Sequence, residues 1–282
     1  MAMTRHYLWG LGPHGFHRIH YTAWGDPDNP RVLICVHGLT RNARDFDFFA
    51  AALANDYRIL CVDAPGRGHS DWFTHKEDYS YPVYAADMAA VIARSGAEQV
   101  DWVGTSMGGL IGMSLAMQPH SPIRKLVMND VGPFIPKEAL ERIAAYVGKP
   151  LRFADLDELE RYLRIIAAPF GPASDEQWRH MALHSSRQTE NGSYQFSYDP
   201  GIAEVFHTAL EDVDLWAMWD AIRCPTLVLR GADSDVLTRA DAKAMTQRGP
   251  RAQLVEFAGV GHAPGLMTDD QIATVRDWLL AD

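Results

Sequence analysis

Short apolar runs alternate with helix-like stretches along most of this chain, and this alternation limits the folds open to it. The apolar runs lie near residues 31–36, 58–63, 100–105, 124–128, 226–230 and 252–257. The main helix-like stretches are residues 45–54, 82–93, 110–117, 239–247 and 268–280. Such runs are typical of parallel strands that helices bury on both faces. The sequence therefore predicts an α/β fold with a mostly parallel central sheet, preceded by an antiparallel hairpin that includes residues 16–24.

The third apolar run leads directly into Gly104-Thr105-Ser106-Met107-Gly108, a Gly-x-Ser-x-Gly sequence followed by a helix-like segment. Glycine has no Cβ, so Gly104 and Gly108 permit a tight turn where strand and helix approach closely. A serine at the apex of such a turn is exposed, and a neighbouring base can activate it as a nucleophile. The amide of Met107 begins the helix and can face developing negative charge. The segment predicts Ser106 as a nucleophile and the Met107 amide as an oxyanion donor.

Two loops after other apolar runs carry the remaining candidate residues. The run 31–36 ends in His37-Gly38-Leu39-Thr40, where Gly38 permits a turn and the Leu39 amide is a second candidate oxyanion donor. We expect His37 and Gly38 to contact substrate. The run 252–257 is followed by a glycine-rich loop that contains His262. His262 is the expected general base, because a histidine is needed late in the order Ser, acid, His.

Together with Asp-Ala-Pro-Gly-Arg-Gly-His-Ser at residues 63–70, these motifs resemble those of the α/β-hydrolase family over nearly the whole chain. The resemblance implies an α/β-hydrolase fold and serine chemistry that needs no cofactor and no metal. It also implies that Asp63, Arg67 and Ser70 stabilise their turn through local hydrogen bonds.

The acid of the expected triad departs from the common pattern of this family. In most members it follows the strand that corresponds to residues 226–230, in the sequence Gly-x-x-Asp. Counted from Gly231, that position holds Ser234, with Asp233 and Asp235 on either side. Some α/β-hydrolases place the acid after the preceding strand, which here ends at Asp130. We favour Asp130 as the acid and keep Asp235 as the alternative.

Between residues 134 and 219 the strand–helix alternation gives way to a helical pattern, clearest at residues 137–146, 156–166 and 175–184. We expect a hydrolase core formed by residues 1–133 and 220–282, with residues 134–219 inserted as a helical lid. Trp178, Trp216 and Trp219 are candidates to line the substrate pocket. Residues 191–201 are rich in turn-forming residues and are expected to form a loop.

Charge and cysteine content limit the partners, metal sites and cellular compartment that we expect for this protein. The formal net charge of −10, without a Lys/Arg-rich run, disfavours nucleic-acid binding. Cys35, Cys61 and Cys224 lie in or beside predicted strands, which favours reduced thiols, and their spacing matches no metal site. No apolar stretch approaches the ~20 residues of a membrane span, and the first residues do not resemble a signal peptide. We expect a cytoplasmic protein without a membrane partner; the sequence predicts no particular oligomeric state.

These features and the resemblance predict a hydrolase that cleaves carboxylic esters of small acyl substrates through an acyl-enzyme. The nearest alternative is a lactonase or a carbon–carbon bond hydrolase, because the same residues serve those reactions. A cofactor-free dioxygenase of this fold is a more remote alternative, since a His–acid pair alone can deprotonate an aromatic substrate. A ligand receptor built on the fold would bind its ligand without turnover.

Overall fold

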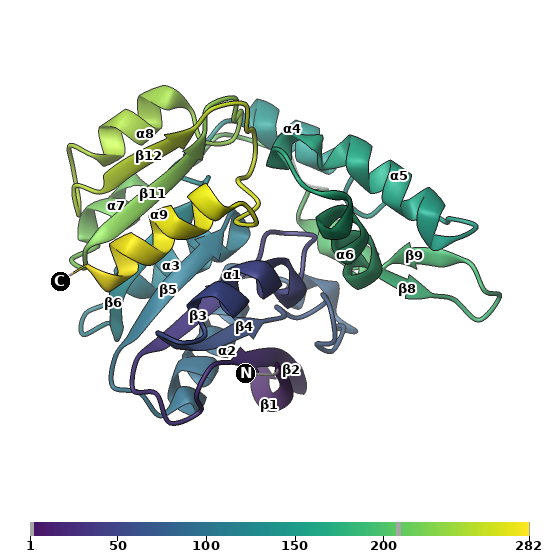
Figure 1. Cartoon of the computed structure of the whole chain (residues 1–282), viewed down its shortest axis with the longest axis horizontal. Helices are drawn as coiled ribbons and strands as arrows, with labels where there is room; N and C mark the ends of the chain where they lie inside the picture. Colours follow the sequence, from purple (N-terminus) through teal and green to yellow (C-terminus); the bar gives the residue numbers. More distant parts are fainter. Residues whose placement is uncertain (1–2, 207–209, 282) are drawn as a thin grey trace.

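A computed structural model describes residues 3–206 and 210–281, and an eight-stranded sheet forms its centre (Figure 1). The strands follow the order β1-β2-β4-β3-β5-β6-β11-β12. Their bounds are β1 Thr4–Gly12, β2 Gly15–Trp24, β3 Val32–Val36, β4 Arg58–Val62, β5 Val100–Thr105, β6 Ile123–Asn129, β11 Thr226–Gly231 and β12 Gln253–Phe257. The strands from β4 to β12 pair in parallel, and β1 and β2 form an antiparallel hairpin at one edge. The predicted mostly parallel sheet is confirmed.

Helices cover both faces of this sheet, as predicted. Their bounds are α1 Asp47–Leu53, α2 Tyr81–Ser95, α3 Met107–Ala116, α7 Trp216–Ala221, α8 Arg239–Met245 and α9 Asp269–Leu280, with short 3₁₀ turns η1 Ala43–Phe46 and η2 Lys76–Asp78. Successive side chains of β3 alternate between two apolar clusters. Ile34 packs in the cluster that includes residues of α2, α3 and α8, whereas Leu33 packs in the cluster that includes residues of α1 and α9. Both faces of the strand are therefore buried, which explains its continuous apolar sequence.

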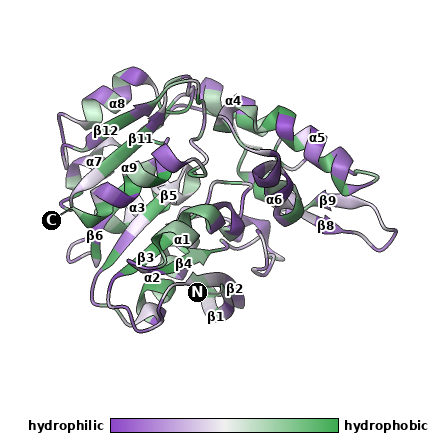
Figure 2. Cartoon of the chain, viewed as in Figure 1, coloured by the Kyte–Doolittle hydropathy of each residue, from purple (hydrophilic) through white to green (hydrophobic). Residues whose placement is uncertain are grey.

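The segment 134–219, in its described residues, lies largely at one end of the sheet, where α4 (Lys137–Ala144), α5 (Leu156–Ile166) and α6 (Asp175–Ser185) are grouped beside each other (Figure 1). Its other elements are β7 Phe134–Ile135, η3 Ala168–Phe170, β8 Ser186–Gln188, β9 Tyr194–Phe196, η4 Pro200–Phe206 and β10 Val213–Asp214. Apolar and polar residues alternate along α5 (Figure 2). Its Leu159 and Leu163 are buried in one cluster with Trp178 and Met181 of α6, so the two helices share a small core of their own.

The expectation of a loop throughout residues 191–201 was wrong. Within that range, β9 pairs with β8 in an antiparallel ladder. Tyr194 and Phe196 pack against the apolar cluster that α5 and α6 share. The tertiary packing of these two aromatic side chains outweighs the turn-forming composition around them.

Candidate active site

Ser106 lies at the junction of β5 and α3 with a strained backbone, φ 51° and ψ −114°. The two flanking glycines are required by sterics. A Cβ on Gly104 would lie 2.2 Å from the carbonyl oxygen of Gly108, and a Cβ on Gly108 would lie 2.0 Å from that of Val36. The start of α3 is thus held directly against the end of β3. This close approach presents Ser106 at the apex of the turn.

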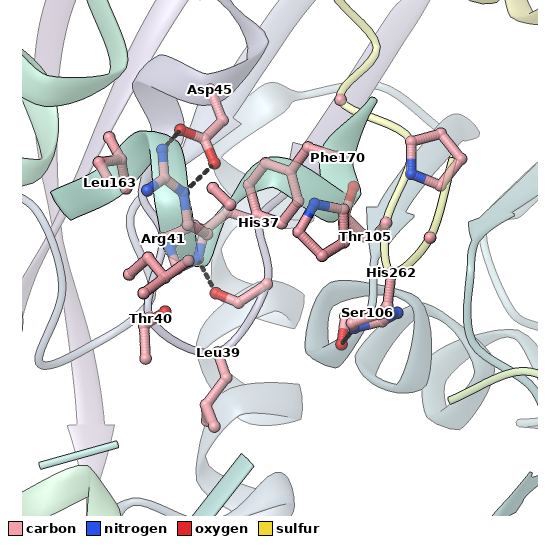
Figure 3. Close-up of a pocket in the computed structure, with 18 of the residues that line it drawn as sticks. His37, Leu39, Thr40, Arg41, Asp45, Thr105, Ser106, Leu163, Phe170 and His262 are labelled. Atoms are coloured by element: carbon pink, nitrogen blue, oxygen red, sulfur yellow. Dashed lines mark hydrogen bonds and ion pairs between the residues drawn. The ribbon is translucent and has the colours of Figure 1, made fainter. Parts of the chain in front are cut away.

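A continuous hydrogen-bonded chain runs from Ser106 to Asp130. The Oγ of Ser106 is 2.9 Å from Nε2 of His262, and Nδ1 of His262 is 2.7 Å from Oδ2 of Asp130. Figure 3 shows the Ser106 and His262 side chains next to each other at the cavity. The structure therefore brings together the three residues that the sequence singled out, in the order nucleophile, base, acid.

Asp130 is fully buried after β6, with φ 55°. Its Oδ1 accepts a hydrogen bond of 2.8 Å from the Gly231 amide, and its Oδ2 accepts one of 2.6 Å from the Ser234 hydroxyl. Because β6 and β11 are neighbours in the sheet, a carboxylate at the end of one strand meets the loop after the other. Ser234, which stands at the family's usual acid position, donates to the displaced acid.

Ser234 is a member of the site that the sequence motifs did not predict. One feature of the sequence indicates this role: a hydroxyl stands at the usual position of the acid, and the carboxylate of Asp130 follows the neighbouring strand. The alternative acid, Asp235, lies elsewhere at the cavity border. It forms an ion pair with Arg142 of α4 (Nη2 to Oδ1 3.0 Å), and about half of each side chain is exposed.

Asn129 connects the parts of the site to one another. Its carbonyl oxygen accepts a hydrogen bond of 3.0 Å from the Ser106 amide. Its buried side-chain amide donates to the Pro264 carbonyl (2.8 Å), in the loop of His262, and to the Thr105 hydroxyl (3.0 Å). One residue thus links the turn at Ser106, the strand before Asp130 and the loop of His262.

Leu39 and Met107, whose amides are the candidate oxyanion donors, both contact the buried guanidinium of Arg67. Nε of Arg67 donates to the Leu39 carbonyl (2.7 Å), and its Nη2 lies 3.6 Å from Sδ of Met107. Met107 opens α3, where backbone amides have no partner within the helix. Across the described residues, neither amide donates a hydrogen bond to another protein atom. Both are thus available to a ligand, while Arg67 holds their residues together.

His37 and Gly38, the predicted substrate contacts, border the cavity, but both ring nitrogens of His37 are hydrogen-bonded to the backbone. Its Nδ1 donates to the Gly38 carbonyl (2.7 Å), and its Nε2 accepts from the Ala64 amide (3.0 Å). Burial disfavours the charged imidazolium and lowers the pKa of His37 to about 4. The side chain therefore stabilises the loop that carries Leu39, and neither ring nitrogen is free to bind a substrate.

A cavity of about 490 Å³ lies above Ser106 and His262. Its apolar border comes chiefly from α5, η3, β9 and the loop before α9, and it includes Leu163, Ile166, Phe170, Phe196 and Met267. Its charged border consists of the pairs Arg41–Asp45 and Arg142–Asp235, together with Asp233. A concave, mostly apolar cavity with a few polar groups is typical of a small-molecule site.

The prediction that Trp178, Trp216 and Trp219 line the pocket was wrong. Among the described residues that border the cavity, none of the three occurs. Trp178 packs between α5 and α6. Trp219 is fully buried and donates to the Arg248 carbonyl (3.0 Å), and the Trp216 ring lies 4.4 Å from the Arg248 guanidinium. Their large apolar surfaces fill spaces between elements, which helical spacing alone does not distinguish from a pocket lining.

Two groups of side chains in the described part of the chain could approach a metal ion. His14, His75 and Glu77 form an exposed group. Asp47, His180 and His184 meet where α6 contacts α1 and η1, but Arg44 already supplies a cation there, because its Nε donates to Asp47 (2.7 Å). Neither group includes a residue of the chain from Ser106 to Asp130. Cys35, Cys61 and Cys224 are free thiols, and over the described ranges no helix is long and apolar enough to cross a membrane.

The chain is similar to known proteins over most of its length. The sequence model of the alpha/beta hydrolase family matches residues 33–276. The chain is 47% identical over 272 residues to a 3-hydroxybutyrate-oligomer hydrolase of Cupriavidus necator, covering 93% of each protein. It is 32% identical over 252 residues to an esterase of Mycobacterium tuberculosis, covering 84% of this chain and 78% of the relative. The crystal structure of an alpha/beta hydrolase from Novosphingobium aromaticivorans superposes with a TM-score of 0.87 at 38% identity, covering 99% of both chains.

Proposed function

The chain belongs to the alpha/beta hydrolase family and is an ester-bond hydrolase, and we propose that Ser106, His262 and Asp130 act as its catalytic triad. The observation that supports this proposal is the unbroken chain of hydrogen bonds from the Ser106 hydroxyl to the Asp130 carboxylate. Strain at Ser106 supports it as well, because unfavourable backbone angles persist where a side chain must be held in one orientation.

The proposed reaction has two stages. Ser106 Oγ attacks the ester carbonyl while His262 Nε2 takes its proton, and the amides of Leu39 and Met107 bind the oxyanion that forms. His262 then returns the proton to the departing alcohol, which leaves an acyl group on Ser106. A water molecule deprotonated by His262 releases this acyl group in the second stage. Asp130 holds the Nδ1–H of His262 and stabilises the imidazolium.

We further propose that the substrates are short oligoesters of a small hydroxy acid. The name of the Cupriavidus relative, a hydrolase of 3-hydroxybutyrate oligomers, suggests this class. The cavity of about 490 Å³ and its aliphatic and aromatic border fit a short chain of this kind. In this proposal residues 134–219 serve as the lid, because α5, η3 and β9 supply much of the apolar border.

Covalent labelling of Ser106 tests the proposed mechanism. A fluorophosphonate should modify the wild-type protein and Ser114→Ala but not Ser106→Ala. Ser114 is a matched control, because it lies in α3, the helix that Ser106 precedes, and its hydroxyl donates to the Ile111 carbonyl (2.7 Å). Hydrolysis of the 3-hydroxybutyrate dimer should fall by several orders of magnitude in Ser106→Ala. Near-normal hydrolysis by folded Ser106→Ala would exclude the acyl-enzyme.

A further inference from the structure

Arg41 begins beside the nucleophile and borders the cavity. A Cβ placed on Gly38 would lie 3.6 Å from Cβ of Ser106 and 3.9 Å from Cγ of Arg41. The first carbons of both side chains therefore lie next to Gly38. From there the guanidinium extends away from Ser106 on the side where Leu163 lies (Figure 3). A ligand bound to Ser106 at one end could therefore reach Arg41 with its other end.

Asp45 holds this guanidinium in one orientation. Nε of Arg41 donates to Oδ2 of Asp45 (2.7 Å), and Nη2 donates to Oδ1 (2.6 Å). The ring of Phe170 lies on another side, with its centroid 5.8 Å from Cζ of Arg41. Only 11% of the Arg41 side chain is exposed. Little side-chain entropy would therefore be lost when a ligand binds to Arg41.

The pairing with Asp45 uses only one edge of the guanidinium. Arginine has five N–H donors, and Asp45 accepts from Nε and Nη2. Among the described residues, Nη1 of Arg41 makes no hydrogen bond. The edge formed by Nη1 and the second hydrogen of Nη2 can bind another carboxylate through two parallel hydrogen bonds.

The charges around the cavity favour this edge over other positions for an anion. Asp233 and Asp235 at the border would repel a carboxylate. The other arginine, Arg142, pairs with Asp235 as Arg41 pairs with Asp45, but 45% of the Arg142 side chain is exposed, against 11% for Arg41. Water and salt screen such an exposed charge. A carboxylate at Arg41 would meet a less exposed cation in a mostly apolar cavity, where a charge-assisted hydrogen bond is stronger.

We propose that Arg41 binds the terminal carboxylate of the substrate and thereby selects esters whose alcohol part is itself a hydroxy acid. The inference rests on the proposed function. In an oligomer of 3-hydroxybutyrate, the free carboxylate always lies on the alcohol side of the ester bond. In the dimer, only a short CH–CH₂ link separates that carboxylate from the ester oxygen. Hydrolysis therefore releases a hydroxy acid that Arg41 held while Ser106 kept the acyl group.

The test compares the 3-hydroxybutyrate dimer as free acid with its methyl ester, which lacks the carboxylate. We expect the wild-type protein to have the higher kcat/KM for the acid. Arg41→Met should lower the ratio of the two kcat/KM values by about 10- to 100-fold, the loss typical of a charge-assisted hydrogen bond. Arg41→Lys should recover part of this ratio, because it keeps the charge but not the planar fork. Arg142→Met, the matched control from the second Arg–Asp pair, should leave the ratio unchanged.

Folding and chemistry are checked separately. Because Arg41→Met leaves Asp45 without its partner, the double variant Arg41→Met with Asp45→Asn is measured as well and should show the same loss of ratio. Turnover of p-nitrophenyl acetate reports whether the triad is intact in every variant. Equal losses for acid and methyl ester, or a loss of ratio in Arg142→Met alone, would overturn the role of Arg41. If the wild-type protein cleaved p-nitrophenyl acetate and both dimers without preference, only this inference would fail; if it cleaved none of them, the proposed function would fail.

Discussion

Asp130→Asn changes one atom at the inner end of the proposed triad. Oδ2 of Asp130 accepts hydrogen bonds from His262 Nδ1 and from the Ser234 hydroxyl, while Oδ1 accepts from the Gly231 amide. An asparagine has a single carbonyl oxygen, and the Gly231 amide is a fixed donor that must keep it. The new NH₂ group then points at His262, whose Nδ1 must become an acceptor.

The kinetic loss follows from the tautomer that this change imposes. With its proton on Nε2, His262 cannot take the proton of Ser106. An aspartate-to-asparagine change in such a triad lowers kcat about 10⁴-fold, which corresponds to about 5 kcal/mol of activation free energy. The asparagine has nearly the same shape and keeps the contact with Gly231, so the cost in folding stability should be only about 1–3 kcal/mol.

The assay is the turnover of p-nitrophenyl acetate together with urea denaturation for Asp130→Asn and Asp235→Asn. Asp235→Asn should change both quantities little, because an exposed ion pair with Arg142 contributes about 0–1 kcal/mol. Folded Asp130→Asn that retained more than about a tenth of wild-type turnover would refute the role of Asp130. A large loss confined to Asp235→Asn would transfer the role to Asp235.

Two further predictions concern neighbouring contacts. Ser234→Ala removes a hydrogen-bond donor to the Asp130 carboxylate and should lower kcat about 10-fold with little change in KM. Ser234→Thr keeps the hydroxyl and should retain most activity. Equal kcat values for the wild-type protein and both variants would contradict a positioning role of Ser234. The lowered pKa of His37, about 4, means that the unfolded chain binds a proton between this value and 6.5 that the folded protein does not. The free energy of unfolding must therefore fall as the pH decreases through this window, and His37 should account for about 2 kcal/mol of that fall by pH 5. In urea denaturation, His37→Gln should lose correspondingly less stability between pH 7 and pH 5 than the wild-type protein. Identical losses in the two proteins would contradict the argument.

Local features of the sequence determined the architecture and two residues of the site. The apolar runs became the parallel strands because burial on both faces leaves no position for polar residues. The glycines around Ser106 determined the sharp turn, since any Cβ there would collide with backbone. Such effects depend on neighbours within a few residues, so the sequence shows them directly. The chain order of the motifs then singled out His262.

Only the tertiary structure decided which carboxylate meets His262 and which side chains border the cavity. Asp130 and Asp235 follow adjacent strands, and their spacing along the chain does not tell which one turns inward. The contacts of Gly231 and Ser234 orient Asp130, while Arg142 from a distant helix pairs with Asp235. The tryptophans of residues 134–219 pack between elements for the same reason: a large apolar side chain is buried wherever the assembled fold leaves space for it. Contacts between distant segments are set by three-dimensional packing, and no local pattern encodes them.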